Sequence, residues 1–206
     1  MSPKSSQSFL SRSAAHTTPK VIFTGILDPK RSKIIQKLGG EIVDSVQQCT
    51  HVVTDKVKRT VKFLCAVAEG KKIVGVTWVD ACSKMGAFVD ETTHVLSDKE
   101  AEKTFSLQES LRRAHSKKLL DGISVYITPH TKPEAADMKA IVESSGGKVL
   151  TAAPTKFSEE TLIISCKEDK PQYTKLIALK YKVYTNEFLL GGVLHQALDF
   201  KNNLLD

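Results

Sequence analysis

Long hydrophobic runs are missing from this sequence of 206 residues. The most apolar stretches, such as residues 61–68, are short and carry a charge, whereas a membrane-spanning helix needs about 20 predominantly apolar residues. The first residues also lack the apolar core of a secretory signal peptide. We therefore expect a protein that has no membrane partner and is not secreted.

Residue patterns that bind metals or carry catalysis are also missing. The four cysteines form no CxxC pair, and the six histidines form neither an HExxH motif nor a cluster with cysteine, so we assign no metal and no cofactor. We expect the cysteines to be reduced, as in intracellular proteins. Because GxSxG, P-loop and GxGxxG motifs are absent as well, we predict a protein that is not an enzyme.

Aromatic residues are scarce, whereas positive charge is in excess. Aromatics make up 6% of the chain, which argues against a stacking platform for single-stranded nucleic acid. The formal net charge of +7 suits an anionic partner, either a phosphorylated peptide or nucleic acid, and does not choose between them. Two basic clusters could contact a phosphate backbone or form solvated surfaces: Lys56, Lys58, Arg59 and Lys62, and then Arg112, Arg113, Lys117 and Lys118.

Strand and helix signals alternate after a serine-rich N-terminal segment, which we expect to be a disordered tail over residues 1–19. A short apolar run at 21–23 predicts a strand, and Asp28-Pro29 predicts a helix start. Further strands are predicted at 41–43, 51–54 and 73–74, and further helices at 60–70 and 77–84, the last with Thr77 and Asp80 at capping-box spacing. This βαββαβα order favours an α/β fold with a parallel sheet flanked by helices.

The same pattern then returns after one predicted helix over residues 100–118. Residues 125–128 match 21–24, and Gly146-Gly147 match Gly39-Gly40. The nearly constant offset indicates an internal duplication. We predict two domains, at 20–97 and 120–206, with a linker helix at 98–119.

This ordered set of landmarks resembles a tandem pair of BRCT domains. Gly39-Gly40 after the first helix and Trp78 in the third helix carry the resemblance. Further segments agree with the family in sequence and spacing, namely residues 59–64, 105–111, 138–143, 146–150 and 192–194. The resemblance implies two BRCT domains, each a small four-stranded parallel sheet flanked by helices. It also implies a helical interface, in which the second helix of the first domain meets the first and third helices of the second.

The resemblance further implies a function. Tandem BRCT pairs bind phosphoserine peptides across the domain junction, so we expect a nuclear, monomeric module of the DNA damage response. The implied ligand is of the pSer-Gln type, such as the phosphorylated C-terminal tail of the histone variant that marks DNA breaks. The alternatives are a direct DNA-binding module, for which nucleic acid would be the partner, and a phosphorylation-independent scaffold with an unused pocket.

A phosphate pocket needs a hydroxyl, a backbone N–H and a cation that converge on a dianion. Thr24 and Gly25 end the first strand, and Lys62 lies in the first turn of the second helix, where free N–H groups also favour an anion. By resemblance, these three residues bind the phosphate; the alternative is a plain turn and a solvated lysine. The second copy has Thr128-Pro129 instead, and proline offers no N–H, so we expect one phosphate site.

The resemblance also places a specificity site at the domain junction, for the third residue after the phosphoserine. The matching positions are Arg59, Leu64, Pro133, Glu187 and Leu190. Arg59 could bind the peptide backbone or a free C-terminal carboxylate, and Glu187 could orient it. The leucines could equally be core residues, and Glu187 a surface charge. Gly191 stands where close relatives carry threonine.

The N-terminal segment Ser6-Gln7-Ser8-Phe9 has a kinase-type Ser-Gln and an aromatic residue three positions after the serine. Phosphorylated at Ser6, it could occupy the pocket of the same or a second copy of the chain.

Overall fold

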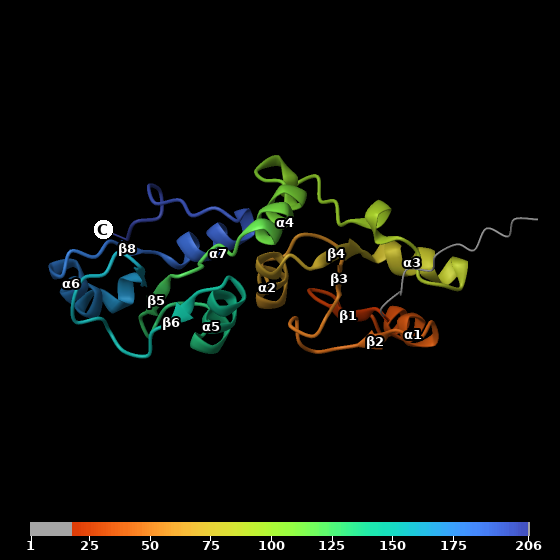
Figure 1. Cartoon of the computed structure of the whole chain (residues 1–206), viewed down its shortest axis with the longest axis horizontal. Coiled ribbons are helices and arrows are strands. Elements are labelled where there is room, and N and C mark those ends of the chain that lie inside the picture. Colours follow the sequence, from red (N-terminus) through yellow and green to blue (C-terminus); the bar gives the residue numbers. More distant parts are fainter. Residues whose placement is uncertain (1–17, 206) are drawn as a thin grey trace, which may run out of the picture.

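The computed structural model describes residues 18–205. Nearly all of the expected N-terminal tail, with the Ser6-Gln7-Ser8-Phe9 segment, lies outside these residues. Figure 1 shows two lobes side by side along the long axis, with helices α2 and α4 at the junction between them. Each lobe contains one four-stranded, all-parallel sheet.

The two sheets have the same topology, as expected for a duplicated fold. Their strand orders are β2-β1-β3-β4 and β6-β5-β7-β8. The first lobe consists of β1 (Lys20–Phe23), α1 (Pro29–Lys37), β2 (Glu41–Ile42), β3 (His51–Thr54), α2 (Val61–Glu69), β4 (Lys72–Gly75) and α3 (Val76–Met85). The second consists of β5 (Ser124–Ile127), α5 (Ala135–Ser144), β6 (Lys148–Val149), β7 (Thr161–Ile164), the 3-10 turn η3 (Lys167–Asp169), α6 (Lys170–Ala178), β8 (Val183–Tyr184) and α7 (Asn186–His195).

Side-chain caps explain where the first two helices begin. Asp28 Oδ1 accepts a hydrogen bond from the Arg31 N–H (2.9 Å) at the start of α1, and Thr60 Oγ1 accepts one from the Phe63 N–H (3.2 Å) at the start of α2. The predicted capping box at Thr77 and Asp80 is wrong. Helix α3 starts at Val76, and its N-cap is Gly75, which has no side chain. The Asp80 carboxylate instead accepts two hydrogen bonds from Arg31, at 2.9 and 2.8 Å.

The segment between the lobes also differs from the prediction of one helix over residues 100–118. It contains two 3-10 turns, η1 (Glu91–His94) and η2 (Ala101–Lys103), before α4 (Leu107–Ser116) begins. Helix α4 begins only at Leu107 because Ser106 is its N-cap, where the Ser106 Oγ accepts a hydrogen bond from the Glu109 N–H (3.3 Å). The helix of the linker is therefore shorter than predicted.

Helix α2 is the centre of the interface between the lobes. It contacts α5 and α7 of the second lobe as well as α4, which confirms the predicted helical interface. Phe63 and Leu64 are at most 1% exposed and pack in one cluster with Met138, Ile141 and Phe188. This shared core fixes the start of α2 relative to α7.

The far ends of α2 and α5 are joined by a lysine. Lys118 Nζ donates hydrogen bonds to the carbonyls of Ala68 (3.0 Å) and Ser144 (3.1 Å), at the C-terminal ends of the two helices. A cation is favoured there because the last carbonyls of a helix carry partial negative charge. None of the helices within residues 18–205 has the length and apolar character needed to cross a membrane.

Candidate functional site

The end of β1 meets the start of α2 through two hydroxyls. Thr24 directly follows β1, is 4% exposed, and has its Oγ1 2.7 Å from Oγ1 of Thr60, the N-cap of α2. The first N–H groups of a helix have no acceptor within it, and the helix dipole makes this end positive. The Thr24 hydroxyl therefore lies where an anion is favoured. Sequence reasoning missed Thr60, although its N-cap position was a signal.

Gly25 adopts a left-handed conformation, with φ of 70°. This backbone conformation favours glycine, and a Cβ at this position would also lie 2.3 Å from Cδ of Lys58, whose side chain lies across it. Lys58 Nζ donates to the Gly25 carbonyl and forms an ion pair with Asp55 at 2.9 Å. Within residues 18–205 the Gly25 N–H has no hydrogen-bond acceptor, so it is available to a ligand.

Lys62 supplies a positive charge in the first turn of α2. Its side chain is exposed, and within the described part of the chain it has neither an ion-pair partner nor a hydrogen-bond acceptor. Thr24, Gly25, Thr60 and Lys62 thus gather at one place, where β1 ends and α2 begins. The chemistry that they offer is a hydroxyl, a backbone N–H and a cation.

A cavity of about 330 Å³ lies at the junction of the two lobes. Arg59 and Glu187 lie on its wall, and Arg59 Nη2 donates to Glu187 Oε2 across the domain boundary at 2.9 Å. Both side chains are substantially exposed, at 40% and 53%, so this surface ion pair positions the guanidinium more than it stabilises the fold. An exposed guanidinium can still bind a carboxylate or a carbonyl with its other N–H groups.

Three predicted specificity residues do not line this cavity. Leu64 is 1% exposed and belongs to the shared core, and Leu190 packs partly buried against that core. Pro133 is half-buried in the loop before α5. The apolar part of the lining comes instead from Val57, Ala101, Phe105 and Leu194.

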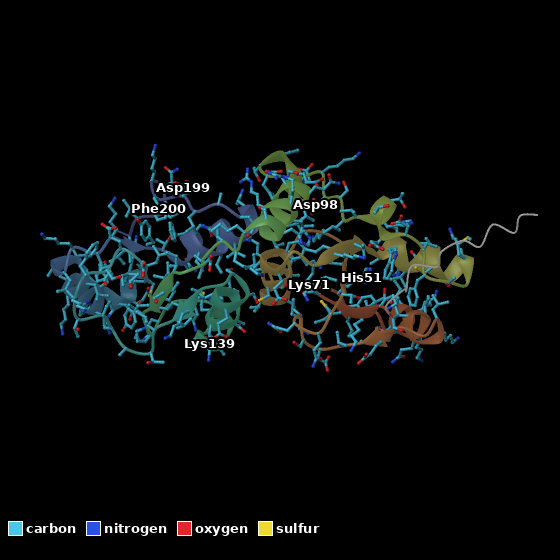
Figure 2. The ribbon with its side chains drawn as sticks, in the orientation of Figure 1. His51, Lys71, Asp98, Lys139, Asp199 and Phe200 are labelled. Carbon is cyan, nitrogen blue, oxygen red and sulfur yellow. The ribbon has the colours of Figure 1, made fainter. Side chains whose placement is uncertain are left out.

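The linker contributes to this cavity, which the sequence did not predict. Thr104 and Phe105 of the linker line it, as does His195 of α7. The ring centroids of Phe105 and His195 lie 5.3 Å apart. Asp98 Oδ2 accepts a hydrogen bond from the Val57 N–H at 2.9 Å. Hydrogen bonds from the Ala101 N–H and then the Val57 N–H lower the pKa of Asp98. Asp98, labelled in Figure 2, therefore ties the linker to the loop that carries Arg59.

The corresponding place in the second lobe is filled by a carboxylate. Thr128 Oγ1 lies 2.7 Å from Ser165 Oγ, and the Asp169 side chain is completely buried at the start of α6. Asp169 accepts hydrogen bonds from the N–H of His130 (2.9 Å) and pairs with its Nδ1 (2.6 Å). Burial by itself raises the pKa of Asp169, but hydrogen bonds from Thr128, His130 and Cys166 outweigh it and lower the pKa to about 2. An internal anion thus occupies this position.

Most of the basic residues considered for nucleic-acid contact have acidic or carbonyl partners. Lys58 pairs with Asp55 and Arg59 with Glu187. Arg112 and Arg113 both bind Glu109, at 2.7 and 2.8 Å, which lowers the pKa of Glu109 to about 2, and Lys118 binds the two helix ends. The two clusters therefore present less free charge than the sequence indicates.

Comparison with known proteins identifies the family. Residues 118–204 match the family model described as BRCT domain. Residues 2–96 match the model described as Regulator of Ty1 transposition protein 107 BRCT domain. With the two parallel sheets and the shared helical core, these matches show that the chain belongs to the BRCT family and contains two BRCT domains.

The relatives and solved structures agree with a tandem arrangement. The chain is 43% identical to PAX-interacting protein 1 of Bos taurus over 200 residues, which cover 90% of this chain and 20% of that protein. It is 37% identical to Mediator of DNA damage checkpoint protein 1 of Homo sapiens over 182 residues, covering 87% of this chain and 9% of that protein. The chain therefore spans about a tenth to a fifth of these curated relatives.

Solved structures give the same architecture. The BRCT5-BRCT6 domains of S. pombe Brc1 superpose with a TM-score of 0.74 at 27% identity, covering 89% of this chain and 95% of that one. Rtt107p, solved in complex with a phosphorylated histone, has a TM-score of 0.65 at 14% identity and covers 91% of this chain and 92% of that one. The second likeness shows a shared fold.

Proposed function

We propose that this tandem BRCT pair is a phosphoserine-peptide binding module of the DNA damage response. The phosphate would bind where β1 meets α2, to the Thr24 hydroxyl, the Gly25 N–H and the Lys62 ammonium. The observation that carries this proposal is the joint presence, among residues 18–205, of an unengaged N–H, a buried hydroxyl and an unpaired lysine at one helix N-terminus. A phosphate dianion accepts hydrogen bonds from all three kinds of donor.

The remainder of the peptide would cross the junction between the domains. Arg59 would bind the peptide backbone or a terminal carboxylate, with Glu187 holding the guanidinium in place at 2.9 Å. Leu64, Pro133 and Leu190 would act mainly by supporting α2 and α7. Val57, Phe105 and Leu194 offer an apolar lining for the third residue after the phosphoserine.

The relatives support the biological setting. One relative is named as a mediator of the DNA damage checkpoint, and one fold neighbour was solved with a phosphorylated histone. We therefore propose a nuclear, monomeric binding module that is not an enzyme, with a pSer-Gln motif such as a phosphorylated histone tail as its ligand. Its domains would extend over residues 20–97 and 120–206, with 98–119 as linker.

Direct DNA binding is the second candidate, and the net charge of +7 favours it. Contacts with a phosphate backbone need free cations, whose counterion release makes the affinity depend on salt. Arg112 and Arg113 share Glu109, and Lys58 pairs with Asp55, so these three cations of the two basic clusters are not free for a phosphate backbone. We therefore favour the phosphopeptide over the nucleic acid.

A calorimetric titration at physiological salt tests the proposal. The ligand is a pSer-Gln-Glu-Tyr peptide with a free C-terminus, and its unphosphorylated twin is titrated beside it. We expect micromolar affinity that requires the phosphate and is lost in Lys62→Met. Amidation of the peptide C-terminus then measures the carboxylate contact assigned to Arg59.

Lys139→Met is the matched control for charge. Lys139 is an exposed lysine on α5, and in Figure 2 it lies on the opposite side of the molecule from Asp98. Its loss changes the net charge as much as the loss of Lys62 does. Equal affinity for the two peptides, or equal effects of the two lysine variants, would overturn the assigned pocket, and tighter binding of duplex DNA would then favour the second candidate.

A further inference from the structure

A second cavity adjoins the junction cavity at α7. Its volume is about 310 Å³, and it shares Glu187, Gly191 and His195 with the first. Its far side is formed by Leu198, Asp199 and Asn203, from the segment that follows α7. Figure 2 labels Asp199 beside Phe200 in this C-terminal segment. The two cavities therefore adjoin along the face of α7 that carries the three shared residues.

Gly191 lies at the point where the cavities meet. It lines both of them, and a Cβ built on it would lie 3.0 Å from Oε1 of Glu187. A larger side chain at this position would therefore project into the passage beside the Glu187 carboxylate. Gly191 is not among the residues with positive φ, so the backbone conformation of α7 does not require glycine at this position. What glycine provides is an open passage over the helix.

The charge of the second cavity differs from that of the first. The first contains Arg59, which pairs with Glu187 at 2.9 Å. The second is lined by Glu187, His195 and Asp199 and by no lysine or arginine among the described residues, and Asp199 is its carboxylate without a basic ion-pair partner there. Hydrogen bonds from the Asn202 side chain and the Lys201 N–H lower the pKa of Asp199, so this exposed carboxylate is ionised at neutral pH. Such a lining complements a cationic side chain.

We propose that the peptide groove continues over Gly191 into this second cavity, where it binds basic residues that follow the third position after the phosphoserine. The inference rests on the proposed phosphopeptide function, and it changes the class of ligand. A groove that ends at Arg59 suits a peptide that ends there with its carboxylate. A groove that continues past Gly191 also accepts phosphorylated motifs inside a chain, provided that lysine or arginine follows.

Three amidated phosphopeptides test this inference in calorimetric titrations with the intact chain. They carry pSer-Gln-Glu-Tyr followed by Lys-Lys, Ala-Ala or Glu-Glu, and each has an unphosphorylated twin. Because the chain has a net charge of +7, long-range electrostatics alone would favour the Glu-Glu extension. We expect the opposite order, with Lys-Lys tighter than Glu-Glu by about two- to fivefold, the size of a partly exposed ion pair.

Variants identify the residues responsible for the ratio of the affinity for the Lys-Lys peptide to that for the Glu-Glu peptide. Gly191→Thr should bring the ratio to one or below, because its side chain obstructs the passage, and Asp199→Asn should reduce it while keeping the Oδ1 acceptor of the turn at 2.9 Å from the Lys201 N–H. Glu143→Gln on α5, which lines neither cavity, is the control and should leave the ratio unchanged.

The outcomes separate this inference from the proposed function. If the phosphopeptides bind better than their twins but Glu-Glu is preferred, or Gly191→Thr keeps the Lys-Lys preference, the extended groove is wrong and the phosphate site stands. If no peptide binds better than its unphosphorylated twin, the proposed function fails and the extended groove fails with it.

Discussion

Removal of the Thr24 hydroxyl tests the candidate phosphate site most sharply. Thr24→Val keeps the size and β-branching of the side chain and replaces only the hydroxyl with a methyl group. In the free protein this removes the 2.7 Å hydrogen bond between the hydroxyls of Thr24 and Thr60. Thr60 keeps its 3.2 Å bond from the Phe63 N–H, so the remaining hydroxyl still has a partner.

The expected magnitudes differ between stability and binding. A neutral hydrogen bond contributes about 0.5–1.5 kcal/mol, so the free energy of unfolding should fall by about 1 kcal/mol. A hydrogen bond to a charged group contributes about 1.5–3 kcal/mol, and Thr24 is only 4% exposed, which limits competition from water. At about 1.4 kcal/mol for each factor of ten, the Kd of a phosphopeptide should rise by about 10- to 150-fold.

Thr128→Val is the matched control, because Thr128 occupies the corresponding place in the second domain. It is 1% exposed, and its hydroxyl contacts those of Ser165 (2.7 Å) and Thr131 (3.1 Å). It should lower stability by at least as much, because Thr128 also hydrogen-bonds the buried Asp169 carboxylate, and it should leave phosphopeptide affinity near the wild-type value. Urea denaturation measures the first effect, and calorimetric titration the second. A loss of less than about threefold in Thr24→Val, or equal losses in both variants, would refute the reasoning.

Three further predictions concern stability. Asp169→Asn should lower the free energy of unfolding at neutral pH by about 1.5–3 kcal/mol. Because the pKa of Asp169 is lowered to about 2, the contribution of its carboxylate is present above pH 4 and is lost as the pH falls toward 2. Urea denaturation at several pH values should therefore show that the stabilities of the wild type and the variant converge in acid. Gly191→Ala should raise the thermal unfolding temperature by removing a helix glycine that costs about 1 kcal/mol. Gly192→Ala should raise it less, because its Cβ would lie 2.7 Å from Cδ2 of Leu198, which must shift; calorimetric melting of both variants checks the order. Lys118→Met should lower the free energy of unfolding by about 1–3 kcal/mol through the two helix-end carbonyls that it leaves without a partner, and urea denaturation that shows no loss would contradict this role.

Much of the fold could be predicted because local signals and the repeat agreed. The starts of the first two helices, at Asp28 and Thr60, were predictable since a short polar side chain is favoured just before a helix. Thr77 and Asp80 had the right spacing for a cap, but Arg31, far away in sequence, binds Asp80. The helix predicted over residues 100–118 is shorter because Ser106 begins a new helix within it. Domain limits remain predictions.

The sequence predicted those residues of the candidate site that lie at the end of a strand or the start of a helix. Thr24, Gly25 and Lys62 lie at a strand end and a helix start, which sequence patterns locate. Lys58 was missed because its place over Gly25 depends on how one loop folds back on another. The linker residue Phe105 reaches the junction cavity only because of tertiary packing, which no local pattern encodes.

The buried carboxylate of Asp169 makes the two halves of a duplicated fold unequal at matching places. In the first domain α2 begins with the neutral Thr60, whereas in the second α6 begins with an anion that is already satisfied. A pair with two open ends could hold a peptide in either direction. Under the proposed function, the closed end gives the tandem a polarity: one phosphate per chain would bind at the first domain, and the C-terminal residues of the peptide would extend over the second.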